Sequence, residues 1–395
     1  MKQIDDIYDA YLNATIGPCQ NLRRFASHQD ILNKRGYQLN LFTRDFLFNE
    51  KEDATPVDFS KGLYFRSYLK KIIKKSALAS VLFQIRKKKE AEMLVKAYLK
   101  LNRHPDIIVF RSLYEAHYYI NNRKGKEAKV LLFHEDDGIR LKMFLQSYPK
   151  LTKSFWEKMI RRWSEDLDRQ VDRNVFIAYT SLKKFAEENP DIPQSKLVAF
   201  HNGIDNLPCI RKERVSDYKY NLCVSGTICA RKGQYIIINA LEKSSKEVRN
   251  KIHVTMIGSG DDMEILKSKV KNLGFGKNVS FLGNISNSKV HDILCGCDIY
   301  ILMSNSEGLP ISIIEGLRAG LGVISTPVAG IPEMVDETNG VLINPDSEEL
   351  AEVFAHIDDF DWDTFGKNSR KKFEEEFDFR QMLSSYCDMM DRLYD

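Results

Sequence analysis

Short apolar runs alternate with helical patterns along most of the chain. Such runs are typical of strands buried on both faces, and their alternation with helices predicts an α/β fold in which parallel sheets are covered by helices. Ligands of these sheets bind outside the carboxyl ends of the strands. The expected strands are 37–43, 107–110, 129–133, 174–179, 196–200, 222–226, 254–257, 279–283 and 299–302.

The first residues fit this pattern poorly. Met1 to Tyr8 carries Asp5 and Asp6, and adjacent carboxylates argue against a central strand. After Gly17 and Pro18 a helical pattern runs over 21–34. The sequence therefore leaves open whether residues 1–8 form the first strand.

Length and composition indicate two domains with substantial cores. The chain has 395 residues, of which 43% are hydrophobic. It has no apolar run of about 18 residues and no apolar N-terminal segment, which favours a cytoplasmic protein. An odd number of scattered cysteines argues against a disulfide framework, so buried thiols are expected even at the close pair. The cysteines are Cys19, Cys209, Cys223, Cys229, Cys295, Cys297 and Cys387.

Charge is distributed unevenly although the net charge is only +4. Residues 1–200 hold 37 basic and 25 acidic residues, and the excess is concentrated in 61–89, where lysines flank apolar positions at helical spacing. This basic segment could rest on an anionic bilayer or a lipid-diphosphate acceptor. An ordinary surface helix with its apolar stripe on the core explains it equally well. Nucleic acid is not an expected partner, because no reading motif accompanies the charge.

The stretch from Ser304 to Val335 carries the strongest chemical signal. A buried strand ends at Leu302, and after Glu307 a helix is expected with Pro310 in its first turn, which places a helix N-terminus where it can bind phosphate. Glu315 lies eight residues beyond Glu307, or about 12 Å along a helix. Two carboxylates flanking a phosphate site suit a nucleotide sugar. A capped helix with Glu315 on a solvated face is the plainer alternative.

Several motifs in matching order resemble those of family 4 retaining glycosyltransferases. They are the Glu307/Glu315 stretch, the Arg231-Lys232 pair and the turn His201-Asn-Gly-Ile-Asp205. The resemblance implies the GT-B fold, with two Rossmann-like domains facing a cleft. We expect an N-terminal acceptor-side domain at 1–205, a nucleotide-sugar domain at 206–379, and a C-terminal helix, 380–395, that crosses back to the first domain.

The resemblance also implies roles for individual residues. His134, Glu307, Arg231 and Lys232 would be catalytic: Glu307 would hold donor-sugar hydroxyls, the basic pair would stabilise the leaving diphosphate, and His134 would reach the reacting centre. Glu315 would hold the ribose. The donor or nucleotide would further contact Gly17, Gly226, Gly258, Gly308, Leu309, Pro310 and Ile311.

The expected reaction is a retaining transfer of a hexosyl unit from a nucleoside-diphosphate sugar, with UDP favoured and GDP possible, to a glycan or lipid-linked acceptor in cell-surface polysaccharide or glycoconjugate synthesis. No metal and no cofactor are expected, since the Asp-x-Asp pairs at 166/168, 359/361 and 361/363 lie within or just before helical patterns. The expected location is the cytoplasm or the inner face of the membrane. The alternatives are a non-catalytic nucleotide-sugar-binding subunit and a GT-B epimerase.

Overall fold

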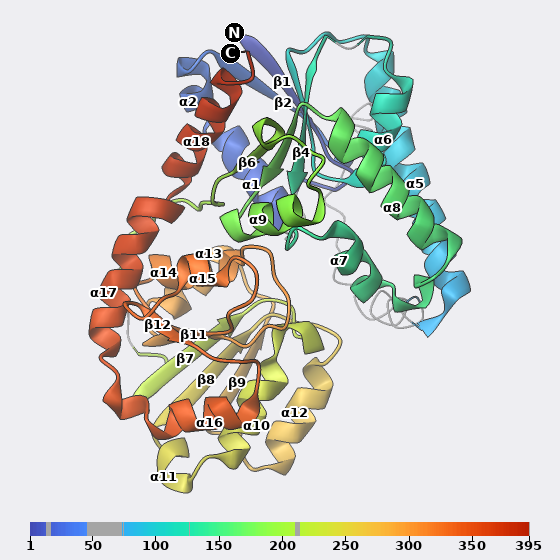
Figure 1. The fold of residues 1–395 in the computed structure, drawn as a ribbon. Helices are drawn as coiled ribbons and strands as arrows, with labels where there is room; N and C mark the ends of the chain where they lie inside the picture. The colour runs from blue at the N-terminus through green and yellow to red at the C-terminus, as the bar shows by residue number, and fades with distance from the viewer. Residues whose placement is uncertain (13–16, 46–72, 74, 126, 210–213, 395) are drawn as a thin grey trace. The chain divides into compact units, whose positions relative to one another are not determined.

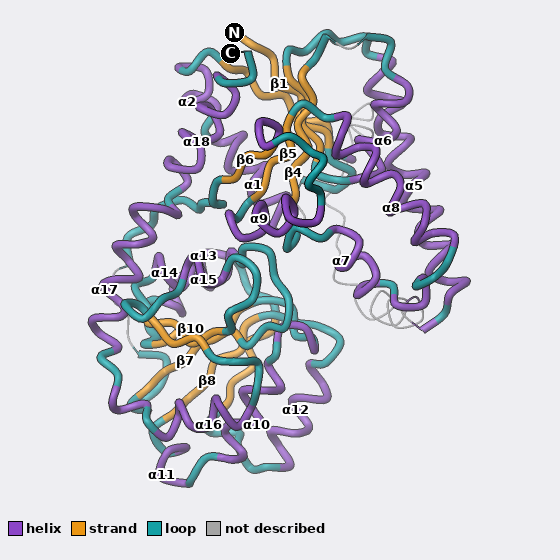
Figure 2. Tube along the Cα trace, in the orientation of Figure 1, coloured by secondary structure: helices purple, strands orange, loops and turns teal. Residues whose placement is uncertain are grey.

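The chain folds into two compact units, each built on a six-stranded parallel sheet (Figures 1 and 2). The computed structural model describes residues 1–12, 17–45, 73, 75–125, 127–209 and 214–394. The first unit comprises 1–200 and 383–395, and the second comprises 201–382. The predicted α/β class with parallel sheets is confirmed.

All pairings in the sheet of the first unit are parallel. The five strands expected in this unit are all present, and β1 lies between β2 and β3. In spatial order the strands are β2 (Tyr37–Phe42), β1 (Lys2–Ile7), β3 (Ile107–Phe110), β4 (Lys129–His134), β5 (Arg173–Phe176) and β6 (Leu197–Ala199).

Residues 2–7 do form a strand inside the sheet, a point that the sequence left open, because both carboxylates of β1 find cationic partners. Asp5 is fully buried and accepts hydrogen bonds from Arg103 Nε and the Tyr98 hydroxyl, each at 2.8 Å. Asp6 is 1% exposed and accepts from Arg111 Nε at 3.2 Å and Nη2 at 3.1 Å. Burying an unpaired carboxylate in a strand costs much more free energy than burying one that is paired with a cation. The two arginines therefore make a buried β1 possible.

The helices of the first unit cover its sheet in Figure 1. The single helix expected over 21–34 is broken at His28, whose φ of −113° and ψ of 28° are not helical. Figure 2 shows the helices as purple tubes around the orange strands. They are α1 (Gly17–Ser27), α2 (Gln29–Lys34), α5 (Ala77–Lys100), α6 (Leu113–Asn122), α7 (Arg140–Ser147), α8 (Phe155–Gln170) and α9 (Tyr179–Glu188).

The C-terminal helix α18 (Phe379–Asp391) returns to the first unit from Leu383 onward, as expected. The Tyr386 ring packs 4.7 Å from that of Phe25, between ring centroids. Arg35 donates to Asp388 at 2.7 Å and to Asp391 at 2.8 Å. The end of the chain is thus held by both apolar and ionic contacts.

The second unit repeats the architecture. Its strands, in spatial order, are β12 (Gly340–Leu342), β11 (Gly322–Ser325), β10 (Ile299–Leu302), β7 (Tyr220–Ser225), β8 (Ile252–Ile257) and β9 (Val279–Gly283). Its helices are α10 (Gln234–Lys243), α11 (Lys246–Arg249), α12 (Met263–Asn272), α13 (Asn287–Leu294), α14 (Ile311–Arg318), α15 (Ile331–Met334), α16 (Ser347–Ala355) and α17 (Trp362–Lys372).

The second unit begins at His201, before the expected boundary after Asp205. Ile204 forms a parallel bridge with Asp378: its N–H donates to Phe377 O at 3.0 Å, and its carbonyl accepts from Phe379 N at 2.9 Å. These backbone bonds tie the turn that follows the first unit to the segment after α17.

The expectation of buried thiols fails at one site, where Cys209 and Cys295 form a disulfide. The expectation rested on the scattered spacing of the cysteines, but the fold brings together two residues 86 positions apart. In the loop-entropy model, closing a loop of that length stabilises a chain by about 4.6 kcal/mol. Cys297, from the close pair, remains a buried free thiol.

Candidate functional site

The candidate site lies at the carboxyl ends of β7, β8 and β10 in the second unit. Glu307 follows β10 in the loop before α14, and Lys232 ends a short 3-10 turn (Ala230–Lys232) in the loop after β7. In a parallel sheet these ends lie at one edge, the edge where ligands bind. Ten of the twelve site residues expected from the sequence belong to this unit, while Gly17 and His134 belong to the first.

The predicted catalytic cluster of the second unit is assembled around the Glu307 carboxylate. Its Oε1 lies 2.8 Å from Lys232 Nζ and 3.0 Å from Arg231 Nη1. The side chains of Glu307 and Lys232 are 7% and 11% exposed, whereas that of Arg231 is 47% exposed. Burial raises the pKa of Glu307, but Lys232 and Arg231 outweigh burial and hold the pKa below its ordinary value of 4.5.

The cluster therefore holds one anion against two cations, leaving an excess of positive charge. Charge-assisted hydrogen bonds to phosphate oxygens are among the strongest that side chains make. A diphosphate placed here would meet a buried ammonium and a partly exposed guanidinium.

Glycines bring the backbones of the site close together. Gly258 has a φ of 122°, and a Cβ there would stand 2.0 Å from Gly226 O. A Cβ on Gly226 would itself lie 3.8 Å from Lys232 Cε. Gly226 and Gly258, both expected near the nucleotide, thus lie beside each other and beside Lys232. No larger residue fits at Gly258 without moving the backbone.

The helix expected after Glu307 begins one residue later than predicted. Pro310 is the N-cap of α14, with a φ of −70° and a ψ of 111°, and Ile311 is the first helical residue. Pro310 was expected inside the first turn, but its ψ is extended. Gly308 O accepts from Gly330 N at 2.9 Å, and Leu309 is 4% exposed, so the loop before the helix is anchored. The N–H groups of the first turn lie at the positive end of the helix dipole.

Glu315 lies one turn into α14 and is half-buried. Its neighbour Gly316 packs against Tyr300 of β10, where a Cβ would stand 2.8 Å from the ring. The glycine lets α14 approach the sheet closely. This close packing fixes the direction in which the helix leaves the edge of the sheet.

Ser304 is a site residue that the sequence reasoning did not single out. It is fully buried, its hydroxyl donates to Glu307 Oε1, and its carbonyl accepts from the Thr326 hydroxyl at 2.7 Å. Ser304 and Glu307 are three residues apart, the Ser-x-x-Glu spacing that occurs where a helix is about to begin. That spacing could have drawn attention to Ser304.

His134 ends β4 in the first unit and is enclosed by protein. Its side chain is 1% exposed and its ring stacks on Phe176 at 4.4 Å between centroids. Arg140 Nη2 lies 3.1 Å from Nδ1, and Asn174 Oδ1 lies 2.9 Å from Nε2. Arginine can only donate, so Nδ1 accepts and Nε2–H donates to Asn174. Burial first, and then Arg140, lower the pKa of His134 well below 6.5.

The remaining expected residue of the first unit, Gly17, is the first residue of α1. His134 and Gly17 are near the carboxyl edge of their own sheet, since β4 ends at His134 and α1 follows β1. Their roles toward donor and acceptor remain predictions.

A cavity of about 940 Å³ lies at the opposite end of the second sheet. It is lined by Tyr220, Asp298 and Leu321, which stand at the amino ends of β7, β10 and β11. It therefore belongs to the edge where parallel sheets do not usually bind ligands. Among the described residues, no group of three or more His, Cys, Asp or Glu side chains is arranged to hold a metal ion.

The second half of the chain matches a known family. Residues 209–373, which are less than half of the chain, fit the model of the glycosyl transferases group 1. An uncharacterized glycosyltransferase of Methanocaldococcus jannaschii, MJ1069, is 25% identical over 67% of this chain and 69% of its own length. The O-antigen biosynthesis glycosyltransferase WbnH of Escherichia coli is 26% identical over 45% of this chain and 48% of its own length.

Solved structures agree with this assignment at the level of fold. HepE of Anabaena, crystallised with UDP-glucose, has a TM-score of 0.68 at 16% identity and covers 99% of this chain and 100% of its own. Sucrose-phosphate synthase of Thermosynechococcus elongatus has a TM-score of 0.71 at 17% identity, and the match covers 100% of this chain and 98% of the synthase chain. The expected GT-B fold and the resemblance to group 1 glycosyltransferases are confirmed. The narrower assignment to family 4 remains a prediction.

Proposed function

We propose that the protein is a retaining hexosyltransferase that uses a nucleoside-diphosphate sugar, with UDP as the favoured base, and acts without a bound metal. The observation that carries the proposal is the cluster of the buried Lys232 and Glu307 with the partly exposed Arg231, which lies just before the N-terminus of α14. This arrangement supplies positive charge where a diphosphate would leave and a carboxylate where sugar hydroxyls would bind.

The residues act through charge and position. As the glycosidic bond breaks, the leaving diphosphate gains negative charge, and Lys232 and Arg231 stabilise it together with the first-turn N–H groups of α14. Glu307, fixed by its cations and by Ser304, accepts hydrogen bonds from donor-sugar hydroxyls. Glu315 would bind the ribose at the other end of the donor.

Two similar proteins support a UDP-sugar as the donor and a cell-surface glycan as the product. HepE is described as bound to UDP-glucose, and a relative is described as an O-antigen biosynthesis enzyme. We therefore favour a UDP-hexose donor and a glycan or lipid-linked acceptor in cell-surface polysaccharide or glycoconjugate synthesis. A non-catalytic nucleotide-sugar-binding subunit would bind the same donor but would not turn it over, and an epimerase would return an altered nucleotide sugar.

The base is tested by thermal unfolding with UDP, GDP, ADP and their sugar conjugates, in the presence and absence of EDTA. We expect UDP and a UDP-hexose to raise the Tm to the same extent with EDTA as without it, because lysine, arginine and helix N–H groups neutralise the diphosphate. Chromatography of the reaction mixture then separates transfer from epimerisation. Transfer releases free UDP from the donor, whereas epimerisation returns an altered nucleotide sugar. Stabilisation that disappears with EDTA contradicts metal independence, and stabilisation by no nucleotide contradicts the donor site.

We also propose that the basic segment 61–89 docks on an anionic membrane surface, which would place the enzyme at the inner face of the membrane. Residues 61–72 and 74 lie outside the described residues. In the described part, α5 exposes Leu78, Leu82 and Ile85 on one face, with Arg86 and Lys89 also exposed. No described helix is both long and apolar enough to span a bilayer.

Co-sedimentation with lipid vesicles tests the docking. Vesicles rich in phosphatidylserine should retain the protein at low salt and release it at high salt, and neutral vesicles should not retain it. A Leu78→Ser/Leu82→Ser variant should bind more weakly, because it removes apolar area that the bilayer would cover. Equal binding to neutral vesicles, or none to anionic ones, refutes the docking.

A further inference from the structure

Three strands of the first unit bring polar side chains together at their carboxyl edge. Tyr8 follows β1, Arg111 follows β3 and Glu135 follows β4. The pairings set Ile7 opposite Phe110, and Phe110 opposite Leu132, so these ends reach the same edge of the sheet.

Arg111 is the centre of this group. Its side chain is 1% exposed, and its Nη1 donates to Glu135 Oε1 at 3.0 Å while Nε and Nη2 donate to Asp6 Oδ2. One guanidinium therefore faces two carboxylates. Asp6 Oδ1 is buried and has no hydrogen-bond partner among the described residues. Buried acceptors that stay unpaired are costly, so they mark places where a donor is missing.

Glu135 is the member of the group that a ligand can reach. Its side chain is 17% exposed, against 1% for Arg111 and 2% for Asp6. Burial raises the pKa of the Glu135 carboxyl, and Arg111 offsets this only in part. One of its oxygens is held by Arg111, which fixes the orientation of the carboxylate. A hydroxyl group from outside can donate to the carboxylate without displacing that contact.

Tyr8 supplies a second polar group at the same edge of the sheet, because it follows β1 as Glu135 follows β4. It is half-buried, and its pKa is raised by burial and by the charge of Glu135. A phenol can both donate and accept, as a sugar hydroxyl requires. Tyr8 is also fixed by its backbone, because its N–H donates to Phe42 O at 3.1 Å.

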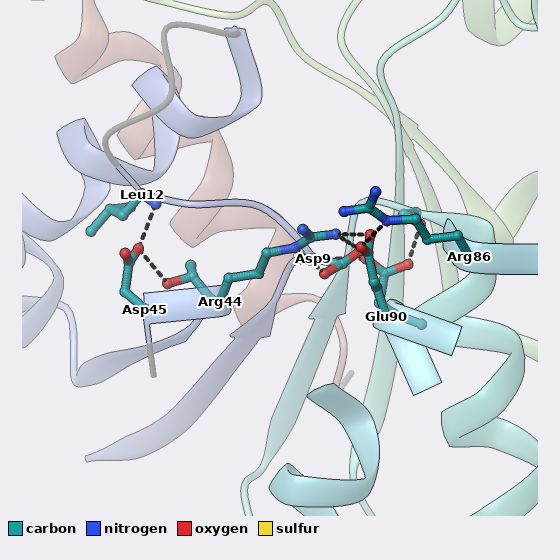
Figure 3. Close-up of polar contacts among 9 residues, drawn as sticks. Asp9, Leu12, Arg44, Asp45, Arg86 and Glu90 are labelled. Carbon is teal, nitrogen blue, oxygen red and sulfur yellow. Dashed lines mark hydrogen bonds and ion pairs between the residues drawn. The ribbon is translucent and has the colours of Figure 1, made fainter. Parts of the chain in front are cut away.

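The segment that follows Tyr8 is held by the ion network drawn in Figure 3. Arg44 Nε lies 2.6 Å from Asp9 Oδ1, and its Nη2 also pairs with Glu90. Leu12 N donates to Asp45 Oδ2 at 2.6 Å, and Asp9 N donates to Glu115 Oε1 at 2.8 Å. These bonds fix the loop and give Tyr8 a rigid base.

The charge of this edge selects the class of ligand. Asp6, Glu115 and Asp136 are buried and the Glu135 side chain is 17% exposed; burial raises the pKa values of all four carboxyls, although the first unit as a whole is basic. A phosphate would be repelled by these carboxylates, and Arg111 is already shared between two of them. Neutral hydroxyl groups can donate to them at no electrostatic cost.

We propose that Glu135 and Tyr8 form a subsite for neutral sugar hydroxyls, so that the acceptor presents an uncharged glycosyl residue, and not a phosphate, to the first unit. Arg111 is a positioning residue that orients Glu135. The inference rests on the proposed glycosyltransferase function and deepens it by naming the class of acceptor.

The first test is ligand binding, which does not depend on turnover. Saturation-transfer NMR would compare the octyl glycosides of glucose, galactose, mannose and N-acetylglucosamine with glucose 1-phosphate and glucose 6-phosphate. We expect at least one neutral glycoside to bind, the phosphates to bind at least tenfold more weakly, and the Glu135→Gln and Tyr8→Phe variants to lose at least tenfold in affinity for the neutral glycoside. Asp172→Asn is the matched control, since Asp172 pairs with Lys129 at the amino edge of the same sheet.

The second test separates this subsite from the donor site. Glu135→Gln should lower acceptor kcat/KM at least tenfold and leave the Tm shift with UDP and the rate of donor hydrolysis unchanged. Unfolding curves of Glu135→Gln and Asp172→Asn would show that both fold. The inference is overturned if phosphorylated sugars bind as well as neutral ones, if no neutral glycoside binds, or if Glu135→Gln behaves like Asp172→Asn. Failure of the proposed function would show differently, as loss of the UDP response in the wild-type protein.

Discussion

Replacing Glu307 by glutamine lowers the rate of glycosyl transfer by about 100-fold or more. The substitution removes the carboxylate that would hold donor-sugar hydroxyls. It also leaves the Lys232 ammonium, 11% exposed, without its counter-charge at 2.8 Å. Lys232→Ala has an effect of the same order, because the leaving diphosphate loses its buried cation. The measurement is release of the nucleoside diphosphate at saturating donor and acceptor.

The matched control is Glu264→Gln, which changes an 83% exposed glutamate of the same unit that pairs with Lys267. It should leave turnover unchanged. Because Glu307 and Lys232 are in contact, the double variant should be little worse than either single variant. Rates for Glu307→Gln close to those of Glu264→Gln would remove Glu307 from the site.

The pH dependence of this cluster has a definite sign. The folded pKa of Glu307 lies below 4.5, so its ion pairs are intact above that pH and are lost only as the pH falls through the lowered value. This carboxyl therefore causes no loss of activity between pH 5 and 8.

Arg111→Met destabilises the first unit by about 3–5 kcal/mol, the cost of leaving buried charges without their partner. Both Asp6 and Glu135 lose their cation, and Asp6 is 1% exposed. Equilibrium unfolding in urea, followed by tryptophan fluorescence and circular dichroism, measures the change. Arg169→Met is the control because Arg169 and Asp191 form an exposed pair, with side chains 48% and 53% exposed.

The loss in unfolding free energy caused by Arg111→Met should become smaller as the pH is lowered. Burial raises the pKa values of Asp6 and Glu135 above 3.8 and 4.5, so the folded state binds protons more tightly than the unfolded state. Protonated carboxyls need no counter-charge. If this loss of stability does not change between pH 7 and pH 5, or is no larger than the loss caused by Arg169→Met, the ion pairs of Arg111 contribute little to the stability of the first unit.

The sequence could predict the parts of this protein that depend on local order. Apolar runs such as 107–110 and 299–302 are buried strands, because a strand covered on both faces must be apolar along its whole length. The cluster of predicted donor residues comes together for the same reason. Glu307 and Lys232 each lie in a short loop after a strand, and the carboxyl ends of parallel strands converge. Their order along the chain was sufficient to place them together.

The tertiary structure decided how charge is compensated. Asp5 and Asp6 made residues 1–8 look unfit for a central strand, but their partners Arg103 and Arg111 come from 98 and 105 positions away. The same reasoning applies to the Cys209–Cys295 disulfide and to the hydrogen bond between His134 and Asn174. The sequence by itself determined where the apolar strands lie and which loops carry the predicted donor residues, because hydrophobic burial follows a local pattern. Only the tertiary structure decided which charged and polar groups are paired, because electrostatic partners are chosen by distance in space.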